Sequence, residues 1–129
     1  MQEKFSRILI GNILKSIRTE QKIPIKKVAQ NMDVSEATIS QFETGKNKPT
    51  NEKIALFTKI CGQTFNFDLD RGLIVNRVYD IYDLYTDLKK EELNETIKIV
   101  KDTHNIACSY ARFEYYLILY MDAIINQKK

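Results

Sequence analysis

The sequence contains few of the residues from which catalytic and metal sites are built. It has one histidine, His104, and two cysteines, Cys61 and Cys108, which lie far apart and outside any CxxC spacing. Each cysteine has apolar neighbours, so both are expected to be small buried hydrophobic residues rather than metal ligands or disulfide partners. The chain also lacks a Gly-rich phosphate-binding loop and a credible pair of nucleophile and base. We therefore expect no enzymatic activity, no metal and no cofactor.

Long apolar runs are missing as well. No stretch of 18 or more apolar residues occurs, and charged side chains at Glu3, Lys4 and Arg7 interrupt the first residues of the chain. These features argue against a membrane span and a signal peptide, so the expected location is the cytoplasm, without membrane contact. With 43% hydrophobic and 29% charged residues over 129 positions, the chain should form one ordinary core or two small ones.

Charge and tyrosine are unevenly distributed along the chain. Residues 1–63 carry a net charge of +5, whereas residues 64–129 carry −2 and contain all seven tyrosines. Such a change near residue 63 indicates two functional units, the basic one facing a polyanion. We predict one domain over residues 1–63, a linker or short strand over 64–71, and a second domain over 72–129.

Apolar residues recur at helical spacing throughout the first part. Ile10, Ile13, Leu14 and Ile17 predict a helix from about residue 6 to 22, which Pro24 ends. Three shorter helices are expected over residues 25–32, 35–44 and 51–61. Ser35 is a suitable N-cap for the second of these, and Gly45 a suitable C-terminal stop.

The second part begins with a different pattern. In QTFNFDLD, apolar Phe65, Phe67 and Leu69 alternate with polar residues, which is the period of a short strand at 64–70, although an irregular helical turn fits as well. The residues after Gly72 predict about three helices. The first of these helices has an apolar seam, a stripe of residues that are alternately four and three positions apart. The seam consists of Ile74, Val78, Ile81, Tyr85 and Leu88. The last, from Ser109, is apolar nearly all round and is expected to be central. The predicted fold class is all-α.

The segment VAQNMDVSEATISQFETG has the features of two helices joined by a tight turn. Ala29 allows the helices to approach closely, and Asp33 occupies a turn position that favours the left-handed backbone conformation. This arrangement is the one that places a second helix in the major groove of DNA. The outward face of that helix is small and polar, as a base-reading surface should be, and consists of Glu36, Ala37, Ser40 and Gln41.

The longer segment IGNILKSIRTEQKIPIKKVAQNMDVSEATISQFETGKNKP resembles the helix-turn-helix of the Xre family, the phage-repressor and Cro-like regulators. The residues that carry the resemblance, at family spacing, are Arg18, Ala29, Ile39, Phe42, Glu43 and Gly45. The similarity covers nearly half of the chain. It implies a lambda-repressor-like domain of four or five helices that reads double-stranded DNA with the helix over residues 35–43.

The resemblance also implies roles for individual residues. Base contacts would fall on Glu36, Ala37 and Gln41, where Gln41 can read adenine, Ala37 can pack on a thymine methyl group, and Glu36 could accept from cytosine. Arg18 would pair with Glu43. Phosphate contacts would fall on main-chain N–H groups at the start of the second helix and on Thr38, Ser40, Thr44, Lys46, Asn47 and Lys48.

Three positions depart from the family pattern. Ile25 stands where many relatives have a glutamine or serine that contacts phosphate, and Asp33 replaces the usual glycine. Glu36 places a negative charge close to DNA, which lowers affinity unless the carboxylate meets a base amino group. The target sequence therefore cannot be inherited from a relative.

The C-terminal helices weakly resemble the opening helical repeats of Rgg-class regulators. About one and a half repeats would fit after Gly72, too few for the concave peptide groove of such proteins. A dimerisation or partner-binding unit is therefore expected. Its candidate contact residues are Ile74, Val78, Ile81, Tyr85, Tyr116 and Tyr120.

Three functions agree with the sequence. The leading one is a homodimeric transcriptional regulator, a repressor that binds a pseudo-palindromic operator. The second is an antitoxin that represses its own operon and holds a toxin with its acidic, tyrosine-rich half. The third is an interaction module, such as an anti-repressor, that binds a protein or peptide and no longer binds DNA.

Overall fold

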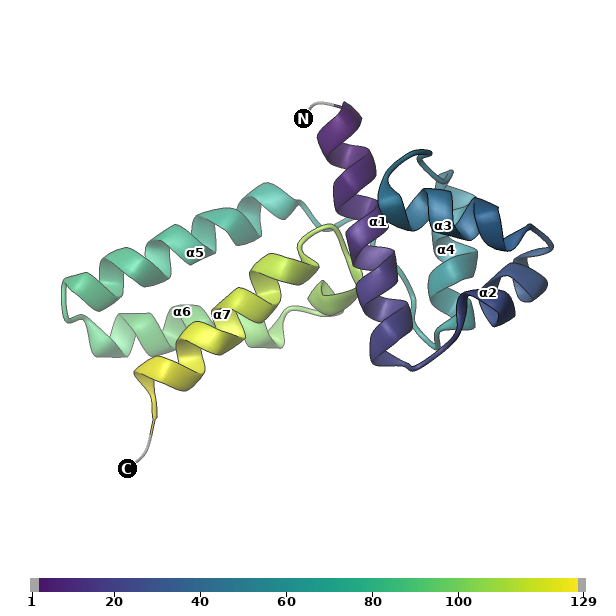
Figure 1. The fold of residues 1–129 in the computed structure, drawn as a ribbon. Helices are drawn as coiled ribbons and strands as arrows, with labels where there is room; N and C mark the ends of the chain where they lie inside the picture. The colour runs from purple at the N-terminus through teal and green to yellow at the C-terminus, as the bar shows by residue number, and fades with distance from the viewer. Residues whose placement is uncertain (1–2, 128–129) are drawn as a thin grey trace. The chain divides into compact units, whose positions relative to one another are not determined.

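The computed structural model describes residues 3–127, and these residues form seven α-helices, one short 3-10 helix and no strand. The all-α prediction is therefore confirmed. The chain divides into two compact units, Met1–Phe65 and Asn66–Lys129, each with its own core. Figure 1 shows the helices of both units, which are described separately below.

The first unit contains α1 (Glu3–Glu20), α2 (Ile25–Met32), α3 (Glu36–Thr44) and α4 (Asn51–Ile60). The apolar stripe predicted for α1 points into the core, where Ile10, Ile13 and Leu14 have no exposed surface. The helix ends two residues earlier than expected because Lys22 adopts a left-handed backbone, with φ of 57°. Pro24 then precedes α2 as its N-cap residue.

The turn between α2 and α3 has the predicted geometry. Asp33 adopts the left-handed conformation, with φ of 56° and ψ of 45°, and the Val34 N–H donates to the Ala29 carbonyl at 3.0 Å. Ser35 caps α3 because its Oγ accepts a hydrogen bond from the Thr38 N–H at 3.1 Å. The turn thus changes the chain direction within three residues, and Ala29, which is buried, lets the two helices approach.

The expectation of a strand at 64–70 is wrong. The Asn66 N–H donates to the Cys108 carbonyl at 2.8 Å, and the Asn66 Oδ1 accepts from the Asp68 N–H at 3.0 Å. These main-chain groups thus bond to Cys108 and to a side chain of the segment itself rather than to a second strand, and the segment forms a loop. The loop ends where the Asp70 carboxylate caps the next helix, α5 (Arg71–Thr86), by accepting from the Gly72 N–H at 2.8 Å. The three apolar residues of the segment do not share one covered face, because Phe65 is buried and Leu69 half-buried, whereas Phe67 is exposed.

The second unit contains α5 (Arg71–Thr86), α6 (Lys90–Asp102), the 3-10 helix η1 (Ile106–Cys108) and α7 (Arg112–Ile125). Its core is formed by Ile74, Ile81, Leu93, Ile97, Val100, Ile106, Ala111 and Ile118. Ion pairs join the helices at two places: Arg71 of α5 to Glu114 of α7 at 2.9 Å, and Lys101 of α6 to Asp122 of α7 at 2.5 Å.

Two sequence-based expectations about this unit are wrong. Ile74 and Ile81, predicted to contact a dimer mate or partner, point into the unit's own core and are 5% and 0% exposed. The helix expected to be central, α7, buries fully only Arg112 and Ile118. Both outcomes have the same cause, the small size of the unit. The buried isoleucines of α5 pack against α6 and α7, and three helices are too few to enclose the remaining apolar side chains of α7 as well.

Candidate nucleic-acid interface

The helix α3 has one buried side and one open side. Ile39, Phe42 and Glu43 face the core of the first unit and are at most 5% exposed. The other side of the helix presents the residues predicted to touch bases: Glu36 and Ala37 are exposed, and Gln41 is half-buried. A helix of this length with a short polar outer face can enter the major groove, which admits one α-helix.

The residues predicted to contact phosphate surround this face. Ser40, Thr44, Lys46, Asn47 and Lys48 are exposed, and Thr38 is half-buried. Two hydroxyl groups already have partners within the helix. The Thr44 Oγ1 donates to the Ser40 carbonyl at 2.9 Å, and the Thr38 Oγ1 lies 2.9 Å from the Ser35 Oγ. The lysines therefore have the greatest freedom to meet a phosphate.

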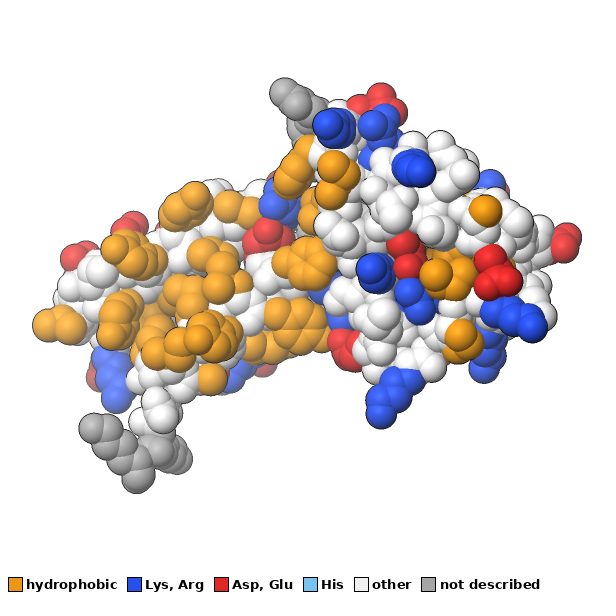
Figure 2. Space-filling model, in the orientation of Figure 1, with side chains coloured by type: hydrophobic (Ala, Val, Ile, Leu, Met, Phe, Trp, Pro, Cys, Tyr) orange, Lys and Arg blue, Asp and Glu red, His pale blue; other side chains and the backbone are white. Residues whose placement is uncertain are grey.

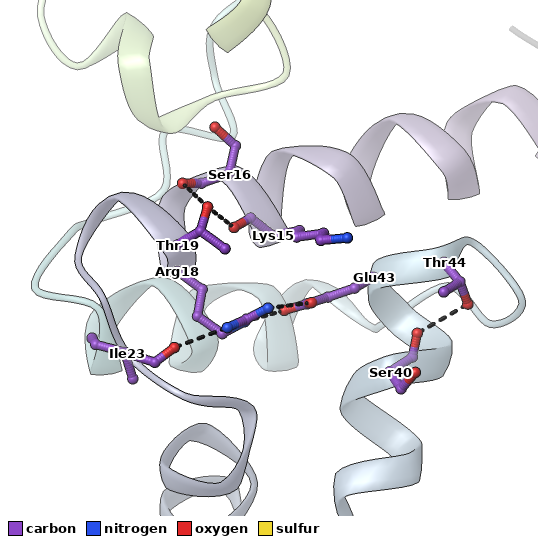
Figure 3. Close-up of polar contacts among 8 residues, drawn as sticks. All are labelled: Lys15, Ser16, Arg18, Thr19, Ile23, Ser40, Glu43 and Thr44. Atoms are coloured by element: carbon purple, nitrogen blue, oxygen red, sulfur yellow. Dashed lines mark hydrogen bonds and ion pairs between the residues drawn. The ribbon is translucent and has the colours of Figure 1, made fainter.

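Arg18 of α1 reaches across to Glu43 near the end of α3 (Figure 3). The Arg18 Nε donates to one carboxylate oxygen at 2.6 Å and Nη2 donates to the other at 2.8 Å, while Nη1 donates to the Ile23 carbonyl at 2.9 Å. The structure thus brings the predicted pair together in a two-pronged, charge-assisted contact. The hydrogen bonds to Glu43 raise the pKa of Arg18.

This contact has a mechanical consequence for the candidate interface. Both side chains are buried, at 9% and 5% exposed, so each is desolvated and depends on the other. One guanidinium joins α1, the loop before α2 and the C-terminal end of α3. The helix α3 is therefore held at its C-terminal end, while Glu36 and Ala37 on its outer face stay exposed.

The chain reverses direction directly after α3. Gly45 has φ of 81°, the left-handed region that favours glycine, and the Lys46 N–H donates to the Gln41 carbonyl at 3.0 Å. The Arg7 Nε of α1 donates to the Gly45 carbonyl at 3.2 Å, which attaches the turn to the first helix. Lys46, Asn47 and Lys48 consequently return alongside the end of α3.

Sequence reasoning missed two features of this surface. The Asn47 Nδ2 donates to the Gln41 Oε1 at 2.6 Å, a contact between two residues that had been given separate roles. Lys26 and Lys27, exposed in the first turn of α2, add positive charge where main-chain N–H groups begin the helix. The positive charge of Lys26 and Lys27 could have been read from the sequence. The hydrogen bond between Asn47 and Gln41 could not, because it depends on how the chain turns at Gly45.

Other kinds of site find no support in the described part of the chain. Among residues 3–127, no group of three His, Cys, Asp or Glu side chains is placed to hold a metal ion. Both cysteines are buried, and burial raises the pKa of the Cys61 thiol. None of the described helices combines the length and apolar character needed to cross a membrane.

A comparison with protein-family models matches residues 14–67 to a family described as helix-turn-helix. The match spans the C-terminal part of α1, from Leu14, and all of α2, α3 and α4. Residues 14–67 are thus a helix-turn-helix domain of the Xre, lambda-repressor-like type, which supports a DNA-binding transcriptional regulator. Searches of curated proteins and of solved structures gave no match. The matched region ends at residue 67, so the likeness of the C-terminal helices to Rgg-class regulators stays a prediction.

Proposed function

We propose that the protein is a dimeric transcriptional repressor that reads an operator with α3 in the major groove. The observation that carries the proposal is the open face of α3 on a domain matched as a helix-turn-helix. Two attachments support it: Glu43 holds the helix to Arg18, and Gly45 holds the following turn to Arg7. A reading helix that is fixed before binding loses little conformational entropy when it meets DNA.

Base reading is assigned to Glu36, Ala37 and Gln41. Ala37 offers a methyl group that can pack on the methyl of thymine, and the Glu36 carboxylate can accept from the cytosine amino group. Glu36 lies in the first turn of α3, where the positive end of the helix dipole favours a negative side chain. That placement offsets part of the cost of bringing a carboxylate close to DNA.

Phosphate contact is assigned first to Lys46 and Lys48, with Lys26 and Lys27 as additions from α2. All four ammonium groups belong to exposed residues of the first unit. Ser40 and Thr38 are retained as weaker candidates. Thr44 is less suited because its hydroxyl proton already goes to the Ser40 carbonyl, which leaves it only an acceptor.

Dimerisation is assigned to an apolar face of the second unit. We define the α5–α7 face by seven exposed side chains: Tyr82, Tyr85, Phe113, Tyr116, Leu117, Tyr120 and Ile124. Figure 2 shows apolar side chains gathered over these two helices. Tyr82 and Tyr85 of α5 line one shallow depression together with Ile124 of α7, so the two helices contribute to a common surface.

The size of this face suits a second copy of the chain. If each side chain loses about half of the roughly 200 Å² that a large residue can bury, the face supplies on the order of 700 Å² per copy, close to the roughly 800 Å² per partner of a standard interface. Its seven side chains carry no charge, so two copies can meet across a two-fold axis without like-charge repulsion. The dimer would not use strand pairing, because residues 64–70 form a loop.

The proposal is tested by selecting bound sites from random double-stranded DNA with the full-length protein. We expect enrichment of a pseudo-palindrome whose half-sites are about 10 base pairs apart, centre to centre. Gln41→Ala should erase the preference at one position in each half-site, whereas Lys98→Ala, a charge change in the second unit, should leave the site unchanged. Absence of any enriched sequence would contradict the proposal and favour an interaction module.

A further inference from the structure

Gln41 and Asn47 are joined by two hydrogen bonds. The Asn47 side-chain Nδ2 donates to the Gln41 Oε1 at 2.6 Å, and the Asn47 main-chain N–H donates to the Gln41 carbonyl at 3.2 Å. Gln41 lies in the last two turns of α3 and is half-buried, while Asn47 lies in the turn that follows and is exposed. The side chain proposed to read a base is therefore already held by a neighbour.

The position of Asn47 follows from the turn at Gly45. The left-handed backbone of Gly45 directs the chain back, so that the N–H groups of residues 46 and 47 both donate to the Gln41 carbonyl. A Cβ at Gly45 would come within 2.9 Å of the Ile8 side chain, and the Gly45 carbonyl accepts from Arg7. Two residues of α1 thus fix the turn, and the turn fixes the asparagine.

The contact changes what Gln41 presents to DNA. An unattached glutamine reads adenine because its amide offers one acceptor to the N6 amino group and one donor to N7. Here the hydrogen bond from Asn47 holds the Gln41 Oε1 toward residue 47, so the Nε2 group, with its two protons, is the end of the amide that turns away from Asn47. Two donors match the O6 and N7 acceptors of guanine rather than the mixed edge of adenine.

We propose that Asn47 is a positioning residue that orients the Gln41 amide so that α3 prefers guanine over adenine at the base which Gln41 reads. The inference rests on the proposed function, since it requires α3 to read DNA. It also replaces the expected role of Asn47: its amide acts on Gln41 and through it on the base, rather than on a phosphate.

The test compares base preferences selected from random DNA by the full-length wild type and three variants. Gln41→Ala identifies the base position concerned. At that position the wild type should enrich guanine, and Asn47→Ala should reduce the preference for guanine over adenine by about tenfold, within the range that one bidentate contact supplies. Asn12→Ala, which removes an exposed amide from α1, is the matched control and should leave the preference unchanged.

Asn47→Asp makes the test directional. A carboxylate only accepts hydrogen bonds, so Gln41 must turn its Nε2 toward residue 47 and its Oε1 toward the base. The preferred base should then be one that presents a donor, adenine or cytosine. The added negative charge lowers affinity for all DNA, so the ratio between bases is the readout.

The outcomes separate this inference from the function on which it rests. If Asn47 instead contacts a phosphate, Asn47→Ala should weaken binding to all sequences and lower the slope of log affinity against log salt by about 0.9, with the base preference unchanged. That result overturns the inference and leaves the proposed function intact. An unchanged preference in both Asn47 variants overturns it as well. A wild type that selects no sequence overturns both. Circular dichroism of each variant checks that the fold is retained.

Discussion

Gly11 of α1 lies against the main-chain carbonyl of Phe42 in α3, so closely that a Cβ at position 11 would overlap the carbonyl oxygen. The carbonyl of Glu43 is nearly as close, 2.9 Å from the same point. Both neighbours are backbone atoms and cannot move aside as the end of a flexible side chain can. Glycine at this position therefore sets how near α3 approaches α1.

We predict that Gly11→Ala destabilises the protein by about 1–3 kcal/mol, the usual cost of overpacking. The direction is informative because, in an exposed helix interior, the same substitution stabilises by up to about 1 kcal/mol. Chemical denaturation followed by circular dichroism measures the difference. Asn12→Ala, at the next and exposed position, is the control and should change stability little. A stabilised Gly11→Ala would show that α1 and α3 are not in close contact.

A second prediction concerns the buried pair Arg18 and Glu43. Either Arg18→Met or Glu43→Leu alone leaves the other charge buried without its partner, and it should lower the free energy of unfolding by about 3–5 kcal/mol. The double variant should cost less than the sum of the two because no charge is left unpaired. The measurement is a double-mutant cycle on the free energy of unfolding, and additive effects would contradict the coupling.

Much of the first unit could be predicted from the sequence because its signals are local. The period of the isoleucines, the Ser35 cap and the turn at Asp33 each depend on a few adjacent residues, and the structure has all three. The pairing of Arg18 with Glu43 came from family resemblance, and no local rule would have given it. The close approach at Gly11 was missed because it depends on which carbonyl lies opposite in the fold.

The second unit was harder to predict from its apolar pattern. The predicted seam holds only in part, because Ile74 and Ile81 are buried, whereas Tyr85 and Leu88 are exposed. Heptad spacing also does not say whether an intramolecular helix or another chain covers the buried residues. Ile74 and Ile81 were therefore assigned to a partner, although α6 and α7 supply the covering residues. The candidate contacts that do stay exposed, Tyr85, Tyr116 and Tyr120, lie on the sides of α5 and α7 away from that core, and Val78 is half-buried against it.

Acid should weaken the attachment of α7 through Asp122. The hydrogen bond from Lys101, with a second from Asn126, holds the pKa of Asp122 below its ordinary value of about 3.9. A carboxyl whose pKa is lower in the folded state stabilises the fold above its unfolded pKa, and this contribution is lost as the pH falls through the folded pKa. The difference in Tm between wild type and Asp122→Asn should therefore be present at pH 6 and shrink below about pH 4. Asp83→Asn, at an exposed aspartate of α5, is the control, and a difference that does not change with pH would contradict the prediction.

Salt dependence should distinguish the lysines after α3 from other positive charges. Lys46→Ala and Lys48→Ala should each weaken binding to specific and random DNA alike, and each should reduce the slope of log affinity against log salt by about 0.9 for a lost phosphate contact. Lys98→Ala removes the same charge from the second unit and should leave the slope unchanged. Fluorescence anisotropy at several salt concentrations measures all three, and an unchanged slope in both Lys46 and Lys48 variants would argue against phosphate contacts there.

The last prediction concerns the α5–α7 face. Tyr120 belongs to this face and is 65% exposed, so Tyr120→Asp should leave the fold intact while placing a carboxylate in the proposed interface. Because the proposed dimer is two-fold symmetric, each copy brings one such carboxylate into the interface. Two like charges that both lose their water should abolish the dimer. Ile81→Asp would be a poor test because Ile81 is fully buried in the core of its own unit and the variant would unfold.

Sedimentation velocity at about 10 µM, a concentration at which a micromolar interface is largely occupied, should give a dimer for the wild type and a monomer for Tyr120→Asp. Ile99→Asp is the matched control, because Ile99 is an exposed apolar residue of α6 outside the defined face. It should remain dimeric and should bind the palindromic site as the wild type does, whereas Tyr120→Asp should bind it much more weakly because it must occupy the two half-sites independently. A wild type that is monomeric at this concentration would contradict the dimer. The α5–α7 face would then be the candidate binding site for a different protein, and an antitoxin that holds a toxin would be the better hypothesis.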